Sequence, residues 1–227
     1  SQGNNTFTIY NPSPSASSQG YSYNYLQWSA VTITITYEEA VSQPSTSASS
    51  VNMGSAVTIY TNRVSTSTTH TLLYTFGNTS GTIATNVGAS VNWTPPLTLA
   101  SQIPSATSGT CTITCQSYIG GTLTGTRTCT LTLNVPSTVV PSISSVTVED
   151  TNSTVASRIQ AYVKMLSTLS VAITAAGSYG STVSSYRTSL DGVTYTTASF
   201  TASKKLSTAG NLTLTVTVTD SRGRTAT

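Results

Sequence analysis

The chain has 227 residues, and nine lysine and arginine residues against six aspartate and glutamate residues give a net charge of only +3. The basic residues do not cluster, which excludes the electrostatic footprint of a nucleic-acid-binding protein, and no apolar run reaches the roughly 20 residues that a membrane-spanning helix needs. Because 37% of the residues are hydrophobic and serine and threonine dominate the remainder, the composition favours β-sheet over helix. We therefore predict an all-β fold with no helix longer than two turns.

Residues 1–42 contain one clear strand, Val31–Tyr37, in which apolar and threonine side chains alternate. A segment this short rarely folds alone without a disulfide or a metal, so we interpret it as the C-terminal strands of an upstream β domain. Three of its tyrosines are spaced by two, so they would share one strand face. With the tryptophan that follows, they would either stack on the sugar rings of a glycan or pack against the upstream domain, and packing is the commoner role of large aromatic side chains. These candidate glycan-stacking residues are Tyr21, Tyr23, Tyr25 and Trp28.

Two proline-containing segments, Gln43–Ser50 and Asn134–Pro141, are interpreted as linkers, because proline has no backbone N–H and discourages continuation of a sheet. They delimit a first module at residues 45–138, which is close to the roughly 100 residues of an immunoglobulin-like β-sandwich. The strands of this module are predicted near residues 55–61, 70–77, 82–86, 90–94, 111–118 and 126–135.

The apolar phase of these strands identifies the core of the first module. A hairpin closing at Gly120-Gly121 joins its last two strands. The side chains expected to be largely buried are Tyr74, Phe76, Trp93, Ile113 and Leu131.

Three cysteines, Cys111, Cys115 and Cys129, alternate with threonine on the two strands of this hairpin. They occupy positions where small core residues belong, and a free cysteine behaves as a small hydrophobic residue. A bond between Cys115 and Cys129 is the alternative, but neighbouring strands rarely give relaxed disulfide geometry. Because an odd number also fits poorly with a secreted disulfide framework, we predict reduced thiols in the core.

The second module spans residues 139–227, and its clearest strand is Leu212–Thr219, whose apolar side chains share one face. A turn is predicted at Asp220–Arg224, with a return strand beginning at Thr225. An immunoglobulin-like sheet that lacks its last strand leaves unpaired backbone groups at an edge, so we expect sequence beyond Thr227 or a strand from another chain to complete it. The other strands are predicted near residues 145–149, 169–175, 183–189 and 193–197.

Two stretches depart from the period of two that marks the strands. Leu99–Ile103 lies between predicted strands of the first module, and Ser157–Met165 follows the first predicted strand of the second. A short helical turn is predicted in each.

Residues with catalytic potential are few and scattered. The single histidine, His70, begins an apolar strand face, and no nucleophile or carboxylate motif accompanies it, so we interpret it as a strand residue and not as a general base. A glycosidase would need two carboxyl groups facing one cleft, and nothing in the sequence brings two together. We therefore expect no enzymatic activity, no cofactor and no metal site. The carboxylates are Glu38, Glu39, Glu149, Asp150, Asp191 and Asp220.

Short motifs rich in glycine, proline and aromatic residues occur in order through both modules: His70–Gly77, Gly81–Gly88, Trp93–Leu97, Gln102–Pro104, Ala175–Gly180, Ser189–Tyr195 and Thr219–Arg224. They resemble the immunoglobulin-like repeats of minor structural proteins from tailed bacteriophages that infect Gram-positive bacteria. The resemblance extends from about residue 45 to the end of the sequence. It implies a virion component at a tail or fibre, with the repeats acting as spacers or host-surface contacts, and it implies no particular site residue.

The leading hypothesis is therefore a non-enzymatic structural protein on the surface of the extracellular virion, serving as a spacer or scaffold for host attachment. The alternatives are a carbohydrate-binding adhesin and a bacterial cell-surface stalk protein. The expected partners are other virion proteins or copies of the chain itself, with a host cell-surface glycan as a further candidate. Neither nucleic acid nor insertion into a membrane is expected.

Overall fold

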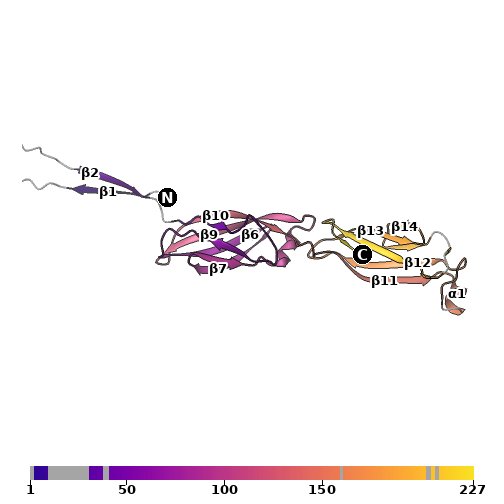
Figure 1. The fold of residues 1–227 in the computed structure, drawn as a ribbon. Helices are drawn as coiled ribbons and strands as arrows, with labels where there is room; N and C mark the ends of the chain where they lie inside the picture. Colours follow the sequence, from indigo (N-terminus) through magenta and orange to yellow (C-terminus); the bar gives the residue numbers. More distant parts are fainter. Residues whose placement is uncertain (1–2, 10–30, 38–40, 159–160, 203–205, 208–209) are drawn as a thin grey trace, which may run out of the picture.

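The computed structural model describes residues 3–9, 31–37, 41–158, 161–202, 206–207 and 210–227. Two β-sandwiches lie end to end along one long axis, preceded by an antiparallel pair of strands, β1 (Gly3–Ile9) and β2 (Val31–Tyr37) (Figure 1). The helices of the described residues are short: η1 (Leu97–Gln102) and α1 (Ser153–Arg158) each have six residues. This confirms the predicted all-β fold. No helix among these residues is long and apolar enough to cross a membrane.

The first sandwich consists of a five-stranded and a three-stranded sheet. The larger sheet has the order β4 (Ser50–Asn52), β10 (Thr122–Asn134), β9 (Ser108–Ile119), β6 (Thr68–Phe76), β7 (Thr79–Val87). The smaller sheet has the order β3 (Ser45–Thr46), β5 (Val57–Tyr60), β8 (Ser90–Trp93). In immunoglobulin nomenclature these sheets are A′GFCC′ and ABE.

The β9–β10 hairpin has the predicted turn. Gly120 and Gly121 both have positive φ, +56° and +82°, which a two-residue type I′ turn requires and which glycine adopts without steric cost. The hairpin register places Leu131 opposite Cys111, and both side chains are buried in the core.

The core of the first sandwich contains the residues predicted from the strand phase. Phe76, Ile113 and Leu131 are buried, and Trp93 is 8% exposed. Tyr74 is half-buried and stacks on Trp93, with ring centroids 5.2 Å apart. Burial of these side chains supplies most of the stabilisation of the sandwich, at about 1.5–3 kcal/mol for each large apolar side chain.

Residues 43–50, expected to form a linker, instead contribute two short strands to the first sandwich. β3 pairs with β5, whereas β4 pairs in parallel with the end of β10. The preceding Ser42 is fully buried. The segment therefore crosses from one sheet to the other within a few residues, so it has no run of alternating side chains long enough to be recognised as a strand.

The second sandwich repeats this arrangement. One sheet has the order β11 (Ser142–Asp150), β12 (Leu169–Ala176), β15 (Ser199–Thr201). The other has the order β14 (Val193–Tyr195), β13 (Val183–Leu190), β16 (Leu214–Asp220), β17 (Thr225–Ala226). The return strand expected from Thr225 is β17, and it pairs with Val218 and Thr219 of β16. The strand order of the second sandwich thus matches that of the first, except that its larger sheet has no described counterpart of the A′ strand β4.

The two short helices test the expected helical turns. η1 confirms the turn expected at Leu99–Ile103. In the second sandwich the helix lies earlier than Ser157–Met165, because Asn152 caps it: its side-chain oxygen accepts the N–H groups of Thr154 (3.2 Å) and Val155 (3.3 Å). The prediction followed the apolar residues and missed this capping signal.

Candidate functional site at the junction between the sandwiches

The turn between β16 and β17 of the second sandwich points toward the first sandwich and is shaped by Asp220. One carboxylate oxygen of this residue accepts the backbone N–H groups of Arg222 (3.0 Å) and Arg224 (2.8 Å). Gly223 completes the turn by donating its N–H to the Asp220 carbonyl at 2.9 Å. Asp220 is 1% exposed, so the conformation of the turn is fixed from within the protein.

Arg222 is the central residue of the junction, and its side chain is only 7% exposed. Its guanidinium donates to Ser178 O (2.7 Å) and Tyr179 O (2.6 Å) in the second sandwich. It also donates to Ala100 O (2.7 Å) and Ile103 O (3.3 Å) in the first. The planar, fixed set of N–H donors of arginine suits this arrangement, which lysine cannot reproduce. One side chain thus bridges four carbonyls from both sandwiches.

The acceptors in the first sandwich lie at the C-terminal end of η1. Pro96 precedes this 3₁₀ helix in an extended conformation (ψ 139°), and its carbonyl accepts the N–H of Leu99 at 3.1 Å. The last carbonyls of a helix carry partial negative charge and lack partners within the helix. Ala100 O already accepts the N–H of Ile103 at 3.1 Å, so the guanidinium is its second donor, and the buried cation complements the helix dipole.

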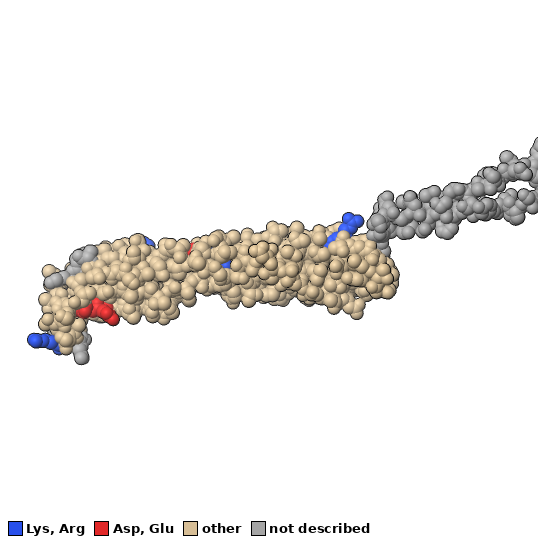
Figure 2. Space-filling view, turned by 180° about the vertical axis from the view of Figure 1, so that it is seen from behind, with Lys and Arg blue, Asp and Glu red and all other residues tan. Residues whose placement is uncertain are grey.

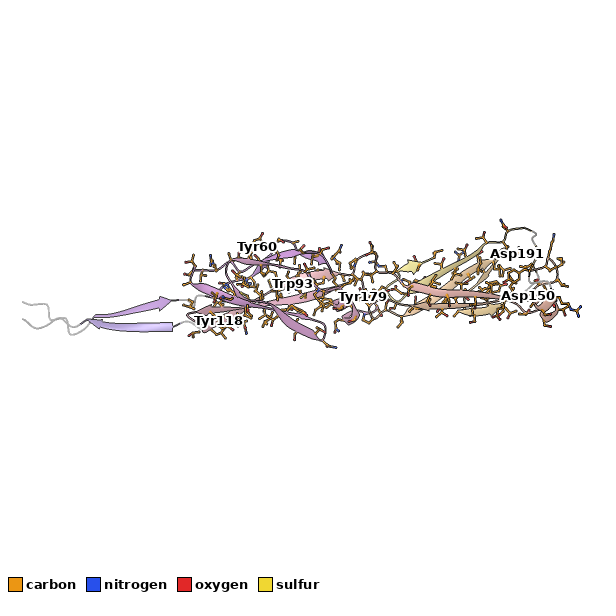
Figure 3. The ribbon with its side chains drawn as sticks, turned by 90° about the horizontal axis from the view of Figure 1, so that it is seen from below. Tyr60, Trp93, Tyr118, Asp150, Tyr179 and Asp191 are labelled. Carbon is orange, nitrogen blue, oxygen red and sulfur yellow. The ribbon has the colours of Figure 1, made fainter. Side chains whose placement is uncertain are left out.

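Further hydrogen bonds lie around the guanidinium. Figure 3 shows the junction, where Tyr179 is labelled. Ser221 Oγ donates to Pro104 O at 2.6 Å, and Arg224 donates to Val135 O at 3.2 Å. Ser178 Oγ donates to Val140 O at 2.6 Å, which ties the second sandwich to the segment that connects the two sandwiches.

Gly180 lets the two sandwiches approach closely. A Cβ atom at this position would lie 3.1 Å from Ser101 Cα, and its φ of +81° is one that other residues rarely adopt. A side chain here would therefore both strain the backbone and separate the sandwiches.

The electrostatics of the junction follow from burial. Burial lowers the pKa of Arg222, the neighbouring Asp220 carboxylate raises it, and Arg224 lowers it. The guanidinium nevertheless stays charged near neutral pH, because arginine titrates far above that range. The second Asp220 oxygen, Oδ2, is buried and accepts no hydrogen bond within the described part of the chain, so its charge acts on Arg222 through space.

His70, the single histidine, lies away from the junction. His70 is 1% exposed in β6, where its Nδ1 faces the carbonyl of Val87 (2.9 Å) and its Nε2 faces Ser42 Oγ (2.8 Å). The carbonyl can only accept, so Nδ1 is the donor, and in the neutral imidazole Nε2 accepts from the serine hydroxyl. The histidine thus anchors the buried Ser42 at the start of the first sandwich.

The described aspartates each bind backbone groups close to them in space. Asp150 accepts the N–H groups of Asn152 and Thr168, and Asp191 accepts that of Ser207. Burial raises the pKa of Asp150. The hydrogen bonds from Ser167, Asn152 and Thr168 together lower it by more than burial raises it, so the net pKa is below its ordinary value. No group of three or more potential metal ligands occurs among the residues that the structure describes. The aromatic candidates at 21–28 and the carboxylates at 38 and 39 lie outside the described residues.

The three cysteines lie on the core face of the β9–β10 hairpin as free thiols. Cys111 and Cys115 are buried and Cys129 is half-buried. Cys129 lies opposite Ile113 and Cys115 lies opposite Arg127, so the register does not place the expected alternative pair face to face. Burial raises the pKa of both Cys111 and Cys115 from 9.0 to about 11.

We expect these buried thiols to resist modification. The thiolate is the reactive form, so Ellman's reagent at pH 8 should react slowly with the native protein and with all three cysteines once urea unfolds it. The raised folded-state pKa of Cys111 and Cys115 stabilises the fold fully below about pH 9, and this contribution is lost as the pH rises through about 11. In urea titrations, a Cys111→Ala/Cys115→Ala double variant should therefore lose less stability over this pH range than the parent chain. Rapid labelling of the native protein would contradict the assignment.

The junction was not predicted from the sequence, although three of the motifs that carried the phage resemblance meet there. Gln102–Pro104, Ala175–Gly180 and Thr219–Arg224 are far apart along the chain and supply most of its contacts. The one local signal was a pair of arginines in a glycine-containing turn of a chain with few charged residues.

The chain is similar to several solved structures at low sequence identity. The chicken CNTN1 FN1–FN3 domains share 10% identity over 83% of this chain and 64% of theirs, with a TM-score of 0.26. The YadV chaperone shares 8% identity over 81% of this chain and 96% of its own, with a TM-score of 0.24. A Ca²⁺-stabilized adhesin that helps an Antarctic bacterium bind ice shares 15% identity over 87% of this chain and 51% of its own, with a TM-score of 0.28.

The chain spans 64% of the CNTN1 structure and about half, 51%, of the adhesin. No curated protein matches the sequence. A family model described as "Siphovirus protein of unknown function (DUF859)" matches residues 1–227, which is the whole sequence. This agrees with the resemblance to tailed-phage proteins. The chain, built from tandem immunoglobulin-like β-sandwiches, therefore belongs to this family of siphovirus proteins.

Proposed function

We propose that the chain is a rigid spacer in the tail or fibre of the virion, where it holds an attachment device away from the particle. The observation that carries this proposal is the Arg222 junction, in which one buried guanidinium binds two carbonyls of each sandwich. Domain contacts within a chain usually permit relative motion unless the interface is well packed. A buried, charge-assisted set of hydrogen bonds fixes the direction of one sandwich relative to the next.

The surface of the molecule supports the same function. Charged side chains are sparse and scattered over a face composed mainly of other residues (Figure 2). A spacer needs a surface that is soluble without attracting charged molecules along its length. Hydroxyl-bearing serine and threonine side chains on the outer faces of the strands meet this requirement. The siphovirus family favours a phage origin over a bacterial stalk protein, and the proposed partners are other virion proteins or copies of the chain.

The location in the particle is the direct test. Antibodies raised against the purified chain should label the tail or its fibres in immunogold electron microscopy of intact virions, and their Fab fragments should reduce adsorption to host cells. An antibody against the major capsid protein is the control, because it should label heads and leave adsorption unchanged. Labelling of infected cells but not of purified virions would contradict the proposal.

A further inference from the structure

A cavity of about 560 Å³ lies in the second sandwich at the end away from the Arg222 junction. Its apolar residues come from both sheets: Leu169 and Val171 of β12 face Leu190 of β13, with Leu206 beside them. All four are buried members of the sandwich core. The cavity is thus a hollow at the end of the sandwich, floored by the edge of the core.

The surface around this cavity is also apolar. Tyr162, Met165, Leu166 and Leu212 are between 36% and 64% exposed, and all lie in the connections at this end of the molecule. Tyr162 and Leu212 line the cavity, and Met165 donates its N–H to the carbonyl of Leu206 at 2.9 Å. Such a concentration of exposed apolar side chains around an apolar cavity marks a binding surface.

Polar groups at the cavity define the other part of a ligand. Lys164 and Asn211 line it together with the apolar residues, and no carboxylate does so among the described residues. Glu149 and Asp150 line a separate hollow that shares only Val148 and Tyr162 with this cavity. Tyr162 donates its hydroxyl to Val148 O at 2.9 Å, which fixes the wall between the two hollows. An exposed ammonium beside an apolar cavity complements a negatively charged group attached to an aliphatic chain.

We infer that this cavity binds an amphipathic anion, with a single aliphatic chain against its apolar lining and an anionic head group at Lys164. The inference does not depend on the spacer function, because the junction lies at the opposite end of the sandwich. The class of ligand follows from the lining: most of its side chains are apolar, and Lys164 supplies a cation and Asn211 an amide beside them.

Isothermal titration of the 227-residue chain with three probes of equal chain length tests the inference. Decanoate should bind saturably with one site per chain, decyl maltoside more weakly, and decyltrimethylammonium weakest, all below their micelle concentrations. Lys164→Gln should weaken the affinity for decanoate by about tenfold, which is the effect of one good ionic contact. It should leave the affinity for decyl maltoside unchanged. Arg127→Gln, which removes an exposed cation from β10 of the first sandwich, is the matched control.

A second pair of variants tests the cavity itself. Leu212→Trp places a larger ring at the mouth and should weaken decanoate by about tenfold or more, whereas Leu123→Trp, at an exposed site in the first sandwich, should not. Near-UV circular dichroism establishes that each variant is folded, and Lys164→Gln alters only an exposed side chain. Absence of saturable binding, equal affinity for the three head groups, or binding to anionic lipid vesicles without binding of monomeric decanoate would each overturn the inference.

Discussion

Replacing Arg222 with alanine is expected to uncouple the two sandwiches while each remains folded. The substitution removes a charge-assisted donor from four carbonyls, three of which keep a weaker donor from the backbone, and it takes the Arg222 cation away from the buried Asp220 carboxylate. Removing one member of a buried charged group in this way costs about 3–5 kcal/mol. Because this free energy holds the sandwiches together, small-angle X-ray scattering should show a broader, shorter distribution of interatomic distances than that of the parent chain.

Two variants make this measurement specific. Arg187→Ala removes an exposed arginine from β13 of the same sandwich and should leave the scattering curve unchanged. Arg222→Lys keeps the charge but cannot present the same planar set of donors, so it should give an intermediate result. An Arg222→Ala chain that scatters as the parent does, and resists proteolysis equally at residues 136–141, would show that the junction does not depend on this side chain.

Replacing Trp93 with alanine should destabilise the first sandwich by about 3–5 kcal/mol, because it leaves a large cavity where the indole stacked on Tyr74. For a domain of this size the melting temperature should fall by at least about 12 °C. Differential scanning calorimetry measures the melting temperature of the first sandwich. In an Arg222→Ala background, where the sandwiches are uncoupled, the transition of the second sandwich is an internal reference.

The control for this substitution lies on the neighbouring strand. Tyr60 of β5 is 42% exposed, so Tyr60→Ala should change the melting temperature far less. If Trp93→Ala melted at the temperature of the parent chain, the assignment of Trp93 to the core would be wrong.

Much of the fold was predictable because the strands are amphipathic and long. The alternation in Cys111–Cys115 and Leu214–Val218 identifies buried faces directly, since each residue of a strand points to the opposite side from its neighbours. The glycine pair at 120 and 121 then fixes the hairpin register. Such local signals suffice for strands and turns.

The parts that were missed depend on contacts distant in sequence or on very short elements. β3 and β4 have two and three residues, which is too few for a period to appear. Arg222 and Ala100 are 122 residues apart, and nothing near either residue indicates that one will accept a hydrogen bond from the other. His70 similarly pairs with Ser42 across 28 residues, so its complete burial could not be read from its own strand.

The parallel pairing of β4 with β10 has a mechanical consequence. Along the sequence, β4 is near the beginning of the first sandwich and β10 is its last strand, although the two are paired side by side. The strands run along the length of the molecule (Figure 1). Tension between the two ends of the sandwich pulls these strands in opposite directions along their own axes. Their hydrogen bonds are then loaded together in shear, instead of opening one after another as in a zipper. If the chain serves as the spacer proposed above, it would gain resistance to extension from this pair of strands.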